Sequence, residues 1–131
     1  PPAIADAPFL AALPKKWLTH PAGGALACIG HVERAWGTSI ISGMSGPQIQ
    51  TFQNAIGRIL IGQPLGYALK DFNERYAALS TGISSTLEKA GWGDKIDQDA
   101  LATNWIERND AEGYVLIGDP AVRLRAEELT A

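Results

Sequence analysis

The chain has 131 residues, of which 46% are hydrophobic and 19% are charged, so it holds enough apolar material for the core of one domain. Its net charge of −3 gives no broad basic surface, which argues against nucleic acid or an anionic membrane as a partner. A single cysteine excludes an internal disulfide and a cysteine-rich zinc site, and without a visible secretion signal we expect a cytoplasmic location.

The first segment of the chain combines an unusual start with a helical pattern. The sequence begins with Pro1 and no initiator methionine, which indicates that residues are missing upstream, either by trimming or by cleavage of a longer precursor. Apolar residues then recur at helical spacing over 8–20, although Pro14 predicts a break. We therefore expect a short helix here.

An apolar run follows that stops at a glycine and continues into charged and aromatic residues. Residues 25–29 predict a buried strand, because strands of this kind belong in sheets that are covered on both faces. Such sheets carry their ligand-binding loops at the carboxyl ends of the strands. The residues after Gly30 are therefore the first candidates for function: His31, Glu33, Arg34, Trp36 and Thr38.

Two amphipathic helices are predicted after a turn-rich segment at 42–47. The first extends from Pro47 to Gly62, with an apolar residue at every third or fourth position. The second begins at Pro64 and keeps one apolar face as far as Gly91. The second helix has the longest regular pattern in the chain.

The last predicted elements are a helix and a strand. Asp97 is expected to cap the helix, which ends at 109–110 and turns Leu101, Trp105 and Ile106 inward. Residues 113–118 predict a strand. This order favours a single α/β domain with parallel strands. Two or three strands make a thin sheet, so we expect further strands upstream.

At this point the sequence resembles a known family. The stretch GGALACIGHVERAW at 23–36 is similar to bacterial caspase-like and gingipain-like cysteine peptidases, including CHAT-type domains. The strand and Gly-Asp-Pro turn at 114–124 resemble the carboxyl end of those domains, and segments 62–68 and 72–76 are similar to the helices between. The resemblance therefore spans nearly the whole chain.

The resemblance implies a three-layer α/β/α caspase-like fold with a mostly parallel sheet. Residues 1–131 would be the carboxyl-terminal half of one peptidase domain, comparable to the small subunit of a caspase. A Cys and His dyad would lie on two earlier strands, so no catalytic residue is assigned in this chain. The implied partners are the upstream dyad-bearing segment and a protein or peptide substrate, and no cofactor or metal is expected.

In the resembled family, the loop after the first strand lines the pocket for the residue before the scissile bond. Here that loop is 31–39, and its candidate substrate-binding residues are His31, Glu33, Trp36, Thr38 and Ser39. Glu33 is either the acidic floor of a pocket for Arg or Lys, or the ion-pair partner of its neighbour Arg34. Trp36 is either an apolar wall for the substrate or an anchor that packs the loop down.

Two residues invite a catalytic interpretation, and each has a structural alternative. His31 is better explained as a loop histidine that bonds to the backbone. Cys28 is better explained as a buried inert thiol than as the partner of His31, because residues three apart on a strand point to opposite faces.

The chain also lacks a phosphate-binding loop and an HExxH motif, which disfavours a nucleotide or metal enzyme. A noncatalytic α/β binding or scaffold module, a pseudo-peptidase, stays the alternative function. The two possibilities differ in whether the upstream segment carries both dyad residues.

Overall fold

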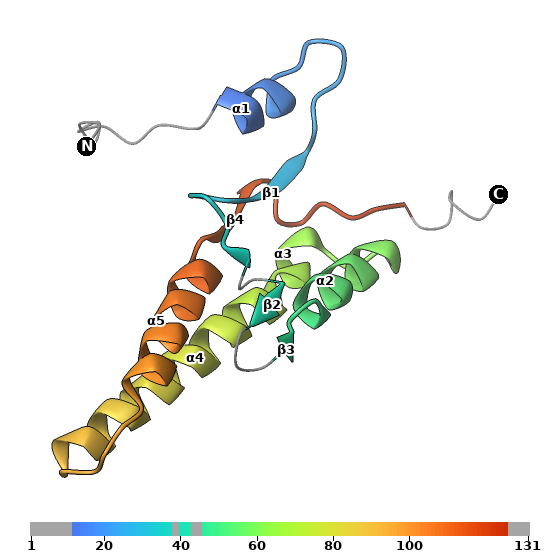
Figure 1. Ribbon diagram of the computed structural model, residues 1–131. Helices are drawn as coiled ribbons and strands as arrows, with labels where there is room; N and C mark the ends of the chain where they lie inside the picture. The colour runs from blue at the N-terminus through green and yellow to red at the C-terminus, as the bar shows by residue number, and fades with distance from the viewer. Residues whose placement is uncertain (1–11, 38–39, 43–45, 126–131) are drawn as a thin grey trace.

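The computed structural model describes residues 12–37, 40–42 and 46–125. Its elements in chain order are α1 (Ala12–Leu18), β1 (Ala27–His31), β2 (Ile41–Ser42), β3 (Gly46–Pro47), α2 (Gln50–Leu60), α3 (Leu65–Ala68), α4 (Lys70–Gly91), α5 (Gln98–Glu112) and β4 (Tyr114–Gly118). Figure 1 shows α4 and α5 as a long hairpin that extends away from β1 and β4. Across the described ranges, no helix combines the length and apolar character needed to cross a membrane.

Strands β1 and β4 form a two-stranded sheet, and they run antiparallel. The predicted parallel arrangement of these two strands is wrong. The antiparallel direction follows from where α5 ends. The amide of Val32, just after β1, donates to the carbonyl of Gly113, just after α5, at 2.9 Å, so the end of the helix lies beside the end of β1. Strand β4 therefore begins where β1 ends and returns along it, with His31 opposite Tyr114. The chain has the expected mixed α/β character, with this small sheet and its helices.

The core lies between one face of this sheet and the helices α2 and α4. Ala55, Leu69 and Phe72 are buried there, and Ile29, Phe52, Tyr114 and Leu116 pack against them. Phe52 and Phe72 meet edge to face, with ring centroids 5.1 Å apart. This geometry is favourable for aromatic pairs beyond the area they bury.

The two middle helices differ in detail from their predicted ranges. Helix α2 starts after Pro47, and the single helix expected over 64–91 is interrupted at Leu69, which separates α3 from α4. The main chain of α3 is bonded to the segment after β4, because the amide of Leu65 donates to the carbonyl of Val122 and that of Gly66 to the carbonyl of Pro120, both at 2.9 Å. These contacts fix α3 as a separate turn against the end of the chain's last strand.

An ion pair joins α2 to α4. A guanidinium nitrogen of Arg58 lies 2.6 Å from a carboxylate oxygen of Asp71. Its hydrogen bond to this carboxylate raises the pKa of Arg58. The pair is charged and directional, so it fixes the approach of the two helices.

Helix α5 begins as expected, since one carboxylate oxygen of Asp97 accepts from the amides of Asp99 and Ala100, each at 3.0 Å. The predicted inward face is wrong for Trp105 and Ile106, whose exposed fractions are 41% and 45%. The buried residues of the helix are instead Glu107, Asp110 and Ala111. Charged groups are tolerated on that face because they have partners: Glu107 lies 3.7 Å from Arg75 of α4, and Asp110 bonds to the loop after β1. The helix also continues past 109–110 to Glu112.

Candidate functional site

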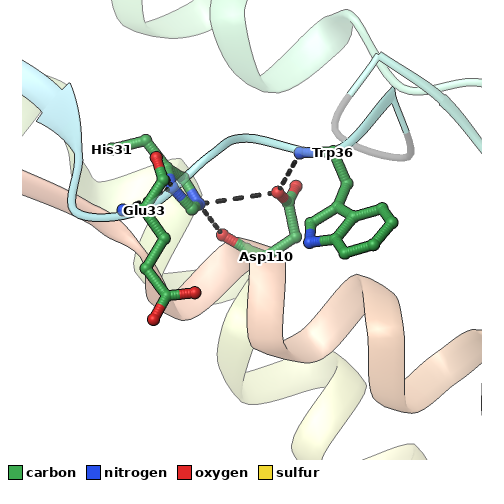
Figure 2. Close-up of polar contacts among 4 residues, drawn as sticks. All are labelled: His31, Glu33, Trp36 and Asp110. Carbon is green, nitrogen blue, oxygen red and sulfur yellow. Dashed lines mark hydrogen bonds and ion pairs between the residues drawn. The ribbon is translucent and has the colours of Figure 1, made fainter. Parts of the chain in front are cut away.

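The loop that leaves the carboxyl end of β1 is attached to the last turn of α5. Figure 2 shows the main-chain nitrogen of Trp36 bonded to the carboxylate of Asp110, at 2.8 Å. The amide of Val32 is bonded to the carbonyl of Gly113. The side chains of 32–37 are all exposed, so main-chain contacts hold this loop in place rather than packing.

His31 is the last residue of β1, so the loop begins one residue later than predicted. Its Nε2 atom lies 2.9 Å from the main-chain oxygen of Asp110 and 3.5 Å from that residue's carboxylate. Its Nδ1 atom lies 3.2 Å from the main-chain nitrogen of Glu33 and 3.0 Å from the carbonyl oxygen. Both ring nitrogens therefore contact main-chain groups. This is the backbone-bonded arrangement that the sequence offered as the alternative to catalysis.

The imidazole of His31 lies directly against Gly113. A Cβ atom at Gly113 would lie 2.2 Å from Nε2, so any side chain there would displace the ring. The edge of Tyr114 meets the imidazole at a centroid distance of 4.9 Å. The sequence reasoning gave Gly113 no role beyond that of a strand boundary.

Asp110 is the residue of this site that the sequence analysis does not single out. The sequence predicts only that it ends a helix, whereas the structure shows it 1% exposed and bonded to the loop. A signal was present in the sequence. An acidic residue in the last turn of a helix is opposed by the helix dipole, so its presence indicates that another group compensates the charge. The hydrogen bond from the Trp36 amide supplies that compensation.

Glu33 directs its carboxylate away from the contacts between His31 and Asp110, as Figure 2 shows. Among the ion pairs of the described residues there is none between Glu33 and Arg34. The side chain lines a cavity of about 440 Å³. The lining residues are His31, Val32, Glu33, Asn109, Glu112 and Gly113. Two acidic residues are therefore among those that line this cavity, and the carboxylate of Glu112 also lies 2.9 Å from Arg108.

Trp36 is anchored by its main chain while its side chain stays exposed. The indole has an exposed fraction of 63%, so it does not pack the loop down. It is available as an apolar wall beside the loop. The other two predicted substrate-binding residues, Thr38 and Ser39, lie outside the described residues.

Cys28 and His31 do not form a catalytic pair. Cys28 is opposite Ile117 and His31 is opposite Tyr114 in the strand register, and the odd separation places the two side chains on opposite faces of the sheet. The other histidine, His20, is exposed, and its Nδ1 accepts from the amide of Ala22 at 3.3 Å. Within the described ranges, no group of three or more His, Cys, Asp or Glu residues is arranged to hold a metal ion.

One comparison with known proteins gives a match. The model of Peptidase family C25 matches residues 5–125. That range contains β1, the loop held by Asp110, all the helices and β4. No curated protein and no solved structure matches the chain.

Proposed function

The chain belongs to peptidase family C25, the gingipain family of cysteine peptidases, and on this premise we propose that it is the small-subunit-like part of a caspase-like endopeptidase. In this role it completes the α/β/α fold and lines the substrate pocket. The Cys that attacks the peptide bond and the His that assists it belong to an upstream segment of the same precursor. That segment and a protein or peptide substrate are its partners.

The chemistry of the chain's own residues supports an upstream dyad. A cysteine peptidase needs a thiolate and a histidine within reach of the same carbonyl carbon. The chain has one cysteine, and Cys28 lies on the face of the sheet opposite to His31. His31 also has both ring nitrogens against main-chain groups. A dyad built from these residues is therefore disfavoured.

Exposed apolar residues near the sheet support a covering partner. Leu26, which precedes β1, is 70% exposed, and Ile56 of α2, which lines a cavity together with Ile29 of β1, is 55% exposed. In the part of the chain that the structure describes, β1 and β4 pair only with each other, so each has an edge available to another strand. We place the dyad-bearing segment against this sheet, where it adds strands and covers apolar surface.

The loop after β1 is the observation that carries the proposed role in substrate binding. It begins at the strand end, and its residues Val32 and Glu33 line the 440 Å³ cavity. In the proposed complex, bound substrate covers the exposed Glu33 side chain, and its carboxylate accepts charge-assisted hydrogen bonds from the guanidinium of Arg or the ammonium of Lys. Substrates with a basic residue before the scissile bond are therefore favoured. Trp36 does not line this cavity, so in this proposal its exposed indole is an apolar wall for another part of the substrate.

In the proposed reaction, the upstream thiolate attacks the carbonyl carbon and backbone amides stabilise the oxyanion. The amine leaves with a proton from the histidine, and water then hydrolyses the thioester. This chain takes part by binding and orienting the substrate. It donates no nucleophile.

The test is amidase activity on short peptides that end in Arg, Lys or Asp before a fluorogenic group. The chain alone is compared with the chain produced together with its upstream segment. Cleavage by the pair only, with preference for Arg or Lys, supports the proposal, and Glu33→Gln then weakens that preference. Arg34→Gln is the matched control, because it removes the neighbouring charge without touching the cavity wall. Cleavage by neither preparation favours the noncatalytic module, and cleavage by the chain alone contradicts the upstream dyad.

A further inference from the structure

Asp110 contacts both ends of the loop after β1. Its carboxylate accepts from the amide of Trp36 at 2.8 Å, and its main-chain oxygen lies 2.9 Å from Nε2 of His31. It is also the less exposed of the two charged residues that are buried in the described ranges, at 1% against 4% for Glu107. One buried residue of α5 thus joins the strand end and residue 36.

From these contacts we infer that Asp110 is a positioning residue for substrate binding. It holds loop 32–37 in the conformation that places Glu33 on the cavity wall and leaves the Trp36 indole exposed. The side chains of 32–37 bury little surface, so the loop lacks a packing force of its own. A loop that is ordered before the substrate arrives binds it without the cost of ordering. The inference rests on the proposed function, since that function makes this a substrate-binding loop.

A purely local role in the helix does not explain Asp110. A negative charge in the last turn of a helix is unfavourable because the helix dipole is negative there. If Asp110 served α5 alone, Asp110→Asn would act only by removing the negative charge from the end of the helix. If it serves the loop, Asp110→Asn retains an oxygen that accepts from Trp36, whereas Asp110→Ala removes the acceptor and leaves the amide unpaired.

The experiment reads loop order and substrate affinity separately. Hydrogen–deuterium exchange of 32–37 is measured by mass spectrometry in the chain with its upstream segment, with the α4 amides as internal reference. KM and kcat are measured on the same preparations. Asp110→Ala is compared with Asp110→Asn and with Asp99→Ala, which is the same type of change at the exposed first turn of α5.

A second pair of variants changes Trp36, the donor of the hydrogen bond to Asp110, instead of the buried acceptor. Trp36→Pro removes the amide hydrogen and the indole and also restricts the backbone, whereas Trp36→Ala removes the indole alone. The difference between them therefore reports the loss of the bond to Asp110 together with this restriction. This pair keeps the inference testable if Asp110→Ala does not fold.

For Asp110→Ala we expect exchange in 32–37 to be about tenfold faster and KM to rise about tenfold with kcat within about twofold. In Asp110→Asn, the exchange of 32–37 and KM should both stay close to the wild-type values, and Asp99→Ala should change neither quantity. Trp36→Pro should exchange faster in this loop than Trp36→Ala. Equal protection of the loop in wild type and Asp110→Ala, or in the two Trp36 variants, overturns the inference. A third outcome separates the two proposals. If the wild-type protein cleaves no peptide, but Asp110→Ala loses protection of 32–37 relative to wild type, the peptidase proposal fails while Asp110 still holds the loop.

Discussion

The amide of Trp36 donates to the carboxylate of Asp110 at 2.8 Å, although the two residues lie 74 positions apart. This bond crosses from a loop with exposed side chains to the buried end of a helix. It explains why the loop after β1 keeps a defined shape without packing of its own. A second bond, from the amide of Val32 to the carbonyl of Gly113, joins the end of α5 to the end of β1, so β4 starts beside the end of β1 and runs antiparallel to it.

Because Gly113 lies so close to His31, adding one methyl group at position 113 is expected to lower the stability of the protein. Gly113→Ala would place a Cβ atom 2.2 Å from Nε2, so the ring has to move and its contact with Asp110 is lost. We expect a destabilisation of about 1–3 kcal/mol, the usual cost of overpacking. Urea denaturation followed by circular dichroism measures it.

The matched control is Gly82→Ala in α4, where an added Cβ meets nothing within 4 Å. It should stabilise the protein by about 0.5–1 kcal/mol, because alanine loses less backbone entropy in a helix than glycine. A Gly113→Ala variant as stable as wild type would contradict the described position of His31.

The N-terminal cap of α5 predicts a measurable loss of stability. Asp97→Ala removes the oxygen that accepts from two amides, Asp99 and Ala100. The expected cost is about 0.5–2 kcal/mol, as for other caps. Asp97→Asn should recover most of it, because asparagine caps about as well as aspartate. If Asn and Ala were equally destabilising at this position, the charge rather than the cap would be responsible.

The ion pair between Arg58 and Asp71 predicts a dependence on salt. The hydrogen bond that the Arg58 guanidinium donates to the Asp71 carboxylate raises the pKa of Arg58. The stabilisation by this pair is therefore fully present below the unfolded pKa of the guanidinium and persists across neutral pH. Asp71→Asn should therefore lower the melting temperature in a buffer of low ionic strength.

High salt should reduce the difference in melting temperature between wild type and Asp71→Asn. The pair is partly exposed, so screening weakens it as the Debye length falls from ~30 Å at 0.01 M to ~3 Å at 1 M. Thermal denaturation at both salt concentrations tests this. A difference that stays the same size in 1 M salt would indicate a role of Asp71 other than its charge.

Local sequence patterns predict where the helices and strands lie along the chain better than they predict how these elements contact one another. The strand at 113–118, the Asp97 cap and the existence of the helices follow from local pattern, and each is present. The direction of β4 depends on where a helix of 15 residues ends in space, which no local pattern contains. The bond between Asp110 and Trp36 is absent from the local pattern for the same reason, since the two residues lie 74 positions apart. The inward face of α5 was misjudged because Glu107 is buried through its pairing with Arg75, which hydropathy does not reveal.

The last prediction concerns the chain's one thiol. Cys28 pairs with Ile117 in the register and faces away from His31, so the proposed peptidase does not use it as a nucleophile. Cys28→Ser should therefore leave kcat of the chain with its upstream segment within about twofold of wild type, well short of the loss of several powers of ten that follows removal of a nucleophile. An alkylating reagent should still abolish cleavage by this variant, because its target is the upstream cysteine. Retained cleavage after alkylation of Cys28→Ser would show that no cysteine does the chemistry, and lost activity in Cys28→Ser alone would return the nucleophile to this strand.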